Sequence, residues 1–421
     1  MFKPYMKSDF QTLLQDLFKL QRLGIKTGLE HTFQLLDTCS NPHQRLKFIH
    51  LAGTNGKGST AAFIDSILRS SGLKVGLYTS PHLVRFNERI RVNGVPICNE
   101  KIVEFMQLYS DDIKRIESTF FETTTAMAFW YFEQENVDIA VIETGLGGRL
   151  DSTNIIIPEI SVITPIGMDH CDLLGNNLKS IAQEKAGIIK ENISVISGYQ
   201  EKIVKEVLVE KALEMQTQVK FIKPPKKSTV TVDGTYFLQE EVEYHLSLMG
   251  EHQAQNASVA IEAVRGIGFS VKEEAIKVGI EKASWPGRFQ VLSRDPFVIY
   301  DVAHNAQGIK AALKTYTNIF GKKPIGLFAL KKDKKLELIV SCLHNQFETL
   351  FVMDDKNGLL MRANKLSMKL NTHGIMATPL DDIKGFTSYL DNDQSGIIFG
   401  SHYIAEAVFK HFQFSFDSGV I

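Results

Sequence analysis

The chain has little cysteine, no long apolar run and almost no net charge, and each of these absences excludes a class of protein. Its 4 cysteines among 421 residues stand far apart with no CxxC pair, so neither a disulfide framework nor a zinc site is expected. No apolar run approaches the ~20 residues that span a bilayer, and the N-terminal segment MFKPYMKSDF lacks the apolar core of a signal peptide. A net charge of −1 gives no general case for nucleic-acid or membrane partners. We therefore expect a cytoplasmic protein that acts on small molecules.

The order of apolar runs predicts two α/β domains, because a chain of 421 residues is too long for one ordinary core. In the first part, apolar runs alternate with helix-patterned stretches, which predicts a parallel sheet wrapped by helices with strands at 48–52, 74–79, 138–144 and 161–166. A hairpin is expected within 228–248, and Trp285-Pro286-Gly287 is the expected hinge. After it, a smaller α/β domain is predicted by short apolar runs at 297–300, 325–330, 349–353 and 396–399.

The segment LAGTNGKGST, residues 51–60, combines glycines, a lysine and hydroxyl side chains in one turn. An apolar run precedes it, and apolar residues at helical spacing follow at 61–68, so it is expected to join a strand to a helix. That arrangement aims backbone N–H groups and the positive end of the helix at an anion. Lys57 adds a charge for phosphate, and Ser59 or Thr60 adds a hydroxyl for Mg²⁺. The usual P-loop spacing is not met between Gly53 and Lys57, so the sequence predicts a close variant of a phosphate loop.

Further polar or glycine-rich segments follow in the order TSPHLVRFNERIRVNG (79–94), FFETTT (120–125), ETGLGGRLDSTN (143–154), TPIGMDHCDLLG (164–175), EKAGIIK (184–190), WPGRF (285–289) and DVAHN (301–305). Together with GTNGKGST, this series resembles the Mur ligase superfamily of ATP-dependent amide-bond ligases, and within it the folylpolyglutamate and dihydrofolate synthases. Functional residues of parallel sheets lie just past the carboxyl ends of the strands. The segments that contain Lys57, Ser80, Glu143 and His170 follow that rule.

The resemblance implies a P-loop-type parallel sheet wrapped by helices, followed by a smaller Rossmann-like α/β domain. The implied limits are 1–284 for the N-terminal ATP-binding domain, 285–296 for the hinge and 297–421 for the C-terminal ligase domain. The implied reaction adds L-glutamate to a folate or dihydropteroate carboxylate through an acyl phosphate. ATP is the implied co-substrate, Mg²⁺, as two ions, the implied metal, and a monovalent cation such as K⁺ a further cofactor. The enzyme is expected to act as a monomer.

Nucleotide and metal residues carry over from the family motif by motif. The resemblance implies that ATP is bound by Thr54, Asn55, Gly56, Lys57, Gly58, Ser59, Thr60, Asn256, Arg288, Asp301 and His304. It implies that Mg²⁺ is held by Ser80, Glu143, His170 and a carbamate on Lys185, and that the last three residues are catalytic. Taken alone, Glu143 at the end of IAVIE is equally a salt-bridged strand end. His170 alone is more often a surface or packed histidine, and Lys185 alone is typical of a solvated helix lysine.

The resemblance also places the pterin of the substrate near Leu23–Gly28, Phe120–Glu122 and Asp151–Thr153. The implied substrate-binding residues are Phe121, Glu122, Asp151 and Ser152. An aromatic ring suits stacking on a pterin, and a carboxylate suits the donor edge of its ring, although either phenylalanine is equally a candidate for the core. Ser401 and His402, after the last predicted strand, are candidates for the glutamate site by position.

Two other functions stay open for these residues. One is another Mur-type amino-acid ligase, although cell-wall members usually carry a complete domain before the phosphate loop and only about fifty residues precede it here. The other is a P-loop NTPase that hydrolyses ATP without ligation, which leaves DVAHN and EKAGIIK unexplained. Whether ATP turnover requires both a folate and glutamate separates these functions.

Overall fold

The computed structural model describes residues 7–24, 28–355, 357–390 and 394–414. These residues divide into two compact units. The first unit holds the described residues of Met1–Pro224 and Gln255–Lys282, and the second holds those of Pro225–Ala254 and Ala283–Gly419. The chain therefore passes from one unit to the other more than once.

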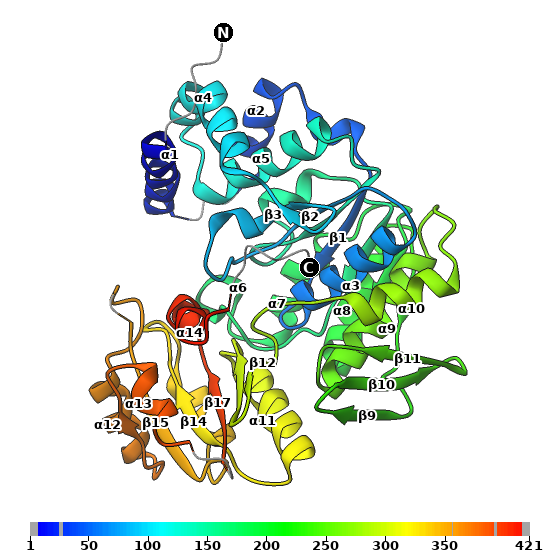
Figure 1. The fold of residues 1–421 in the computed structure, drawn as a ribbon. Coiled ribbons are helices and arrows are strands. Elements are labelled where there is room, and N and C mark those ends of the chain that lie inside the picture. Colours follow the sequence, from blue (N-terminus) through cyan, green and yellow to red (C-terminus); the bar gives the residue numbers. More distant parts are fainter. Residues whose placement is uncertain (1–6, 25–27, 356, 391–393, 415–421) are drawn as a thin grey trace. The chain divides into compact units, whose positions relative to one another are not determined.

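An eight-stranded sheet forms the centre of the first unit (Figure 1). Its strands are β1 Phe48–Ala52, β2 Val75–Tyr78, β3 Ile90–Val92, β4 Val95–Pro96, β5 Ile139–Glu143, β6 Ile160–Ile163, β7 Val195–Ser197 and β8 Val219–Phe221. Their order is β4-β3-β2-β5-β1-β6-β7-β8, in which β3 and β4 form an antiparallel edge and the other neighbours are parallel. The four strands expected from the apolar runs are confirmed as β1, β2, β5 and β6, which are neighbours in the parallel part.

Helices cover this sheet and make its central strands inaccessible to water. The helices are α1 Lys7–Lys19, α2 Glu30–Thr38, α3 Lys57–Ser70, α4 Asn99–Ile116, α5 Phe120–Gln134, α6 Cys171–Leu174, α7 Leu178–Ala186, α8 Lys202–Glu214, α9 Glu251–Arg265 and α10 Glu273–Lys282. Strands β1 and β5 are buried along their whole length. Parallel strands that are covered on both faces read as continuous apolar runs, which is why FIHLA and IAVIE predict strands.

The helix that follows the phosphate loop is more deeply buried than its sequence predicts. We expected an apolar face over 61–68, whereas every residue from Gly58 to Leu68 of α3 is buried. Helix α3 lies between the sheet and α10, and the two helices pack closely. Because α10 is distant in the sequence, the pattern of α3 alone does not indicate a second partner.

A six-stranded sheet forms the centre of the second unit. Its strands are β12 Gln290–Arg294, β13 Phe297–Asp301, β14 Ile325–Phe328, β15 Thr349–Val352, β16 Thr378–Pro379 and β17 Ser395–Phe399. They lie in the order β12-β13-β17-β14-β15-β16, and all neighbours except β12 and β13 are parallel. Its helices are α11 Ala306–Phe320, α12 Ala363–Thr372, α13 Ile383–Thr387 and α14 Ala405–His411. The strands expected after the hinge are confirmed as β13, β14, β15 and β17.

The segment expected to form a hairpin is a three-stranded antiparallel sheet. It consists of β9 Ser228–Thr231, β10 Gly234–Gln239 and β11 Val242–Leu246. This sheet belongs to the second compact unit, whereas we expected the first domain to continue to residue 284. The reason is tertiary packing, since β9 contacts α11 and Val230 packs against the core of the second unit.

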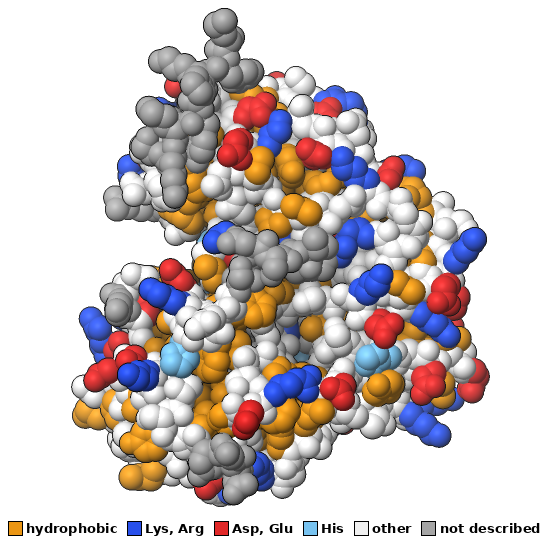
Figure 2. Space-filling view, viewed as in Figure 1, with side chains coloured by type: hydrophobic (Ala, Val, Ile, Leu, Met, Phe, Trp, Pro, Cys, Tyr) orange, Lys and Arg blue, Asp and Glu red, His pale blue; other side chains and the backbone are white. Residues whose placement is uncertain are grey.

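The molecular surface agrees with the balanced charge of the sequence. On the face that Figure 2 shows, basic and acidic side chains are interspersed. Within the described ranges, no helix has the length and apolar character needed to cross a membrane.

The contact between α3 and α10 generates a stability prediction. A Cβ on Gly279 of α10 would lie 2.4 Å from Cα of Ile67 in α3. We expect Gly279→Ala to lower the free energy of unfolding by about 1 kcal/mol or more, because overpacking of ~1–3 kcal/mol outweighs the helix propensity of alanine. Gly268→Ala is the matched control, since a Cβ there meets no atom within 4 Å. Urea unfolding of both variants checks the prediction, and equal stability of the two would contradict the close packing.

Candidate active site

The phosphate loop connects β1 to α3 and has a backbone shape that only glycine adopts readily. Gly53 has φ 153° and Gly56 has φ 86°. A Cβ on Gly53 would lie 1.9 Å from Oγ1 of Thr164, and one on Gly56 would lie 2.3 Å from Oδ1 of Asn256. Both positions therefore need glycine for conformation and for space. The second contact also places Asn256 of α9 directly against the loop.

Main-chain hydrogen bonds attach the loop to the segment that follows β6. The N–H groups of Thr54 and Asn55 donate to the carbonyl of Pro165 at 3.0 and 3.2 Å. The Thr54 hydroxyl lies 3.0 Å from both the carbonyl and the N–H of Gly167. The loop is therefore fixed between two neighbouring strands of the parallel sheet.

Two lysines donate to the same carbonyl of the loop. Nζ of Lys57 lies 3.3 Å from the oxygen of Gly53, and Nζ of Lys185 lies 2.8 Å from it. Lys185 belongs to α7 and its residue is only 5% exposed, so the sequence-based alternative of a solvated helix lysine is wrong. Burial, followed by the charge of Lys57, lowers the pKa of Lys185 to about 7.

The carboxylate of Glu143 lies beside this pair at the end of β5. It is buried, and its Oε1 lies 3.7 Å from Nζ of Lys57. Its Oε2 accepts a hydrogen bond of 3.2 Å from the N–H of Ser80, which follows β2. Three residues expected at the site, Ser80, Glu143 and Lys57, thus meet at one edge of the sheet, although they come from different strands and loops.

His170 occupies a more open position than these residues. It has φ 50° and precedes α6, and its side chain is 49% exposed, with Nε2 at 4.0 Å from Oδ2 of Asp169. Among the residues that the structure describes, no group of three or more His, Cys, Asp or Glu side chains is placed to hold a metal ion. A site with three or more protein ligands at Glu143 would therefore include at least one group that is not a His, Cys, Asp or Glu side chain.

Phe121 and Glu122 begin α5 and have well-defined structural contacts. The ring of Phe121 covers Gly145, where a Cβ would lie 2.4 Å from its Cζ. Oε2 of Glu122 accepts a 2.6 Å hydrogen bond from the N–H of Thr119, which makes Glu122 part of the capping box of α5. Its Oε1 faces Nδ1 of His31 at 3.7 Å. The sequence pattern T-x-x-E indicates the cap, but nothing in it indicates His31.

Asp151 organises the turn that follows β5. Its Oδ2 accepts from the N–H of Leu146 at 2.8 Å, and its Oδ1 accepts from the N–H and the hydroxyl of Thr153 at 3.1 and 2.5 Å. Burial raises the pKa of this carboxyl, although the hydrogen bonds oppose the shift. Ser152 is also buried and begins a single turn of 3₁₀ helix, Ser152–Ile155. Of the segment Leu23–Gly28, residues 25–27 lie outside the described residues.

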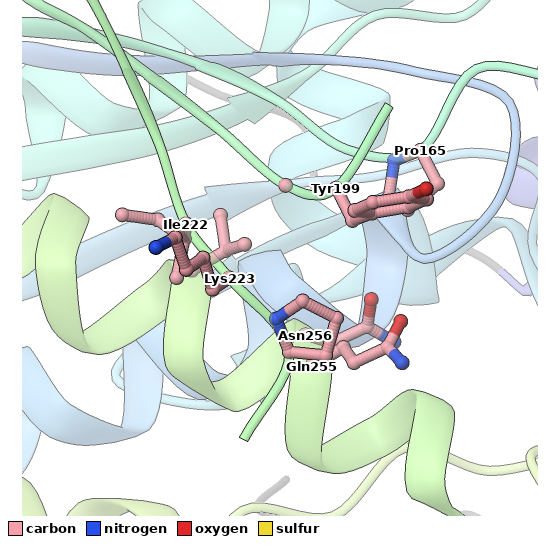
Figure 3. Close-up of a pocket in the computed structure, with 9 residues that line it drawn as sticks. Pro165, Tyr199, Ile222, Lys223, Gln255 and Asn256 are labelled. Atoms are coloured by element: carbon pink, nitrogen blue, oxygen red, sulfur yellow. The ribbon is translucent and has the colours of Figure 1, made fainter. Parts of the chain in front are cut away.

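A small pocket lies next to the phosphate loop in the first unit (Figure 3). Its walls combine apolar side chains with the amide groups of Gln255 and Asn256, and include Pro165, Tyr199, Ile222 and Lys223. Pro165 accepts the hydrogen bonds of the loop and Asn256 touches Gly56. Two residues of the pocket wall are therefore in contact with the phosphate loop. Sequence analysis missed Tyr199 and Gln255, which lie in no recognised motif.

The second unit brings WPGRF and DVAHN together. The carboxylate of Asp301 accepts from the N–H of Phe289 at 2.9 Å and of Ala303 at 2.7 Å, and the Gly287 carbonyl accepts from Val302 at 2.9 Å. Burial raises the pKa of Asp301, and the nearby charge of Arg288 opposes that shift.

His304 and Ser401 also have defined partners in the second unit. Nδ1 of His304 lies 3.0 Å from the carbonyl of Val302. Ser401 lies just after β17, and its hydroxyl accepts from the N–H of Tyr403 at 3.1 Å.

Comparison with known proteins agrees with this arrangement. The model of the Mur ligase middle domain matches residues 51–264, and that of the Mur ligase glutamate ligase domain matches residues 287–394. A dihydrofolate synthase/folylpolyglutamate synthase of Bacillus subtilis is 37% identical over 77% of this chain and 81% of its own length. A folylpolyglutamate synthase of Lacticaseibacillus casei is 32% identical over 89% and 92%, respectively.

Solved structures show the same likeness across nearly the whole chain. The Mycobacterium tuberculosis folylpolyglutamate synthase complexed with ADP and AMPPCP has a TM-score of 0.87 at 28% identity. The match covers 96% of this chain and 99% of that one. The chain therefore belongs to the folylpolyglutamate synthase/dihydrofolate synthase family of Mur ligases, as the order of its motifs, its two α/β units and these similarities agree.

Proposed function

We propose that this enzyme uses ATP to join L-glutamate to a carboxylate of a folate or of dihydropteroate. One observation carries the proposal. Lys57 and Lys185 donate to the carbonyl of Gly53 in a glycine-rich loop, and Glu143 lies 3.7 Å from Nζ of Lys57, in a chain of this ligase family. Such a loop presents backbone N–H groups and a lysine to phosphate. The names of the relatives supply the folate and glutamate substrates.

The proposed reaction passes through an acyl phosphate, because a carboxylate is a poor electrophile in water. A carboxylate oxygen of the folate attacks the γ-phosphorus of ATP, and ADP leaves. The glutamate amine then attacks the acyl carbon and loses a proton, while phosphate leaves with the former carboxylate oxygen. Both first reactants are anions, so the protein contributes mainly by holding them together and offsetting their repulsion. Lys57 and the loop N–H groups are proposed to do this for the phosphates.

We propose that ATP is bound by the whole loop Thr54–Thr60 and by Asn256 of the first unit. We propose Arg288, Asp301 and His304 as the ATP-binding residues of the second unit. Two observations support this assignment. Asn256 lies against Gly56 of the loop, and hydrogen bonds hold WPGRF and DVAHN together in the second unit. The proposed domain limits stay 1–284, 285–296 and 297–421, except that residues 225–254 belong to the second compact unit. A monomeric state and a cytoplasmic location are also part of the proposal.

The side chains of Glu143 and Ser80 carry oxygen atoms, and Mg²⁺ prefers hard oxygen ligands. We propose that Ser80, Glu143 and His170 hold the metal together with a carbamate on Lys185. Imidazole is an unusual ligand for Mg²⁺, so His170 is the member with the weakest chemical support. When bound, the metal neutralises charge on the phosphoryl group in transfer. We assign no residue to the monovalent cation that the resemblance implies.

The position of Lys185 supports its proposed carbamylation. Its amine is buried close to Lys57, and an ammonium group is disfavoured where another cation is near and water is excluded. Only the unprotonated amine reacts with CO₂. The product would be an anion that still has one N–H for the Gly53 carbonyl. Two Mg²⁺ ions need such an anion, because Glu143 provides only one fixed negative charge among the proposed ligands.

On the substrate side, we propose Phe121, Glu122, Asp151 and Ser152 as the pterin region. Gly145 and Phe121 form one wall, since no side chain separates them. Both carboxylates already accept main-chain N–H groups, so they can contribute only their remaining lone pairs. The alternatives, a different Mur-type ligase or an NTPase without ligation, predict other substrate requirements. An assay that compares dihydropteroate with tetrahydrofolate decides which substrate is used.

The proposed reaction predicts strict coupling between ATP and both other substrates. ADP should form only when a folate or dihydropteroate and glutamate are present together, in step with a new amide. With ¹⁸O in the substrate carboxylate, one labelled oxygen should appear in the released phosphate, as mass spectrometry can measure. ADP release without glutamate would favour the NTPase, and unlabelled phosphate would contradict the acyl phosphate.

Glu143 provides a second prediction. Glu143→Ala and Glu143→Gln should lower turnover by ~10²–10³-fold, the usual effect of removing a group that stabilises charge in the transition state. ATP affinity should change much less, because Lys57 and the loop N–H groups are retained. Glu214→Ala is the matched control, since that carboxylate pairs with Lys211 on the surface of α8. Near-normal turnover in both Glu143 variants would reduce this residue to a structural ion pair.

The carbamate on Lys185 provides a third prediction. Lys185→Ala should lose most activity, and formate or acetate should partly restore it by replacing the lost anion. Lys185→Arg should stay inactive, because a guanidinium keeps the cation and forms no carbamate. Lys202→Ala is the control, as the Lys202 side chain is 94% exposed on α8. Steady-state assays with and without formate measure the effect, and full activity in Lys185→Arg would refute the carbamate.

A further inference from the structure

A buried histidine of β1 is connected to the turn that follows β5. His50 is 0% exposed, and its Nε2 lies 2.9 Å from Oγ1 of Thr153. The hydroxyl of Thr153 in turn donates to Oδ1 of Asp151 at 2.5 Å. His50, Thr153 and Asp151 therefore form one hydrogen-bonded chain, which we call the His50 chain. It runs from the central strand of the sheet to the turn 145–151.

The direction of each hydrogen bond in the His50 chain follows from the donors available. An ionised Asp151 only accepts, so the single proton of the Thr153 hydroxyl goes to it. The oxygen of Thr153 then accepts from His50, which requires the proton of the imidazole to be on Nε2. Nδ1 of His50 has no hydrogen-bond partner among the described residues, as expected of a neutral ring with a bare Nδ1. Burial, followed by the charge of Lys190, lowers the pKa of His50 to about 3, so the ring is neutral near pH 7.

The turn held by the His50 chain touches two parts of the candidate site. Gly145 lies against the ring of Phe121. Gly148 lies against α7, since a Cβ there would be 2.9 Å from the carbonyl of Lys185. A shift of the turn would therefore move the wall of the proposed pterin region and press on the helix that carries Lys185. The phosphate loop begins only three residues after His50, but it is fixed separately through Pro165.

We propose that His50 and Thr153 are positioning residues that set the place of the turn 145–151, and with it the affinity for the pterin substrate. Neither residue needs to touch the substrate. They act through Asp151, whose carboxylate accepts from Leu146 and Thr153. The proposal deepens the function proposed above and rests on it, because it assumes a pterin beside Phe121.

Thr153→Val and Thr153→Ser form the central test. Valine keeps the shape but removes the hydroxyl, leaving the His50 N–H and Asp151 without that partner, whereas serine keeps the chain intact. We expect Thr153→Val to raise KM for the folate substrate by about tenfold and to leave KM for ATP within twofold. Thr153→Ser should keep KM for the folate substrate and KM for ATP close to their wild-type values. Thr217→Val is the control for a lost hydrogen bond elsewhere, since Thr217 donates to the carbonyl of Ile193.

A second measurement detects the hydrogen bonds of the His50 chain directly and does not depend on turnover. In ¹⁵N-histidine-labelled protein, His50 should show a neutral ring protonated on Nε2 in the wild type and in Thr153→Ser. In Thr153→Val, its Nε2–H signal should shift. An Nδ1-protonated His50, or equal rises in KM for folate and ATP in Thr153→Val, would overturn the inference. A wild-type enzyme that shows this ring signal but binds neither folate nor dihydropteroate would instead overturn the proposed function.

Discussion

Two lysine side chains donate to one main-chain carbonyl, that of Gly53, and the geometry of the candidate site depends on this arrangement. Lys57 comes from the start of α3 and Lys185 from α7, so the carbonyl joins two helices to the end of β1. It can do so because Gly53 has no side chain where Thr164 approaches. Lys57 is a cation in a largely buried place, and burial together with its charge disfavours the ammonium form of Lys185. Glu143 faces Lys57, and phosphate is proposed to supply further negative charge.

Buried carboxylates near strand ends have different tasks in this fold. Asp151 and Asp301 each accept main-chain N–H groups on both oxygens, and so they shape the turns around them. Glu143 accepts from Ser80 but also faces Lys57. The family resemblance assigns the three acids to different ligands, namely Glu143 to metal, Asp151 to the substrate and Asp301 to ATP. Their hydrogen bonds indicate that Glu143 has the strongest structural support as a ligand for metal, while the aspartates contribute mainly to local structure.

Much of the fold follows from local sequence, whereas the contacts around the site do not. Strands such as Phe48–Ala52 are continuous apolar runs, and the phosphate loop is recognisable from its glycines and Lys57. Packing between distant segments has no local signal, which is why the full burial of α3 was missed. The interpretation of Lys185 as a solvated helix lysine was wrong for the same reason, because the apolar residues around α7 come from other elements. His50 was overlooked because a histidine inside an apolar strand forms no recognisable motif.

The central claim is that Lys185 is buried beside Lys57 as a reactive amine that becomes an anionic ligand. The most direct measurement is a ¹³C NMR spectrum of the protein equilibrated with ¹³C-bicarbonate near neutral pH, since acid would release a carbamate before mass spectrometry. The account predicts a carbamate resonance in the wild type that is lost in Lys185→Ala. Identical spectra for the two proteins would contradict it and leave Lys185 as a structural donor to the Gly53 carbonyl.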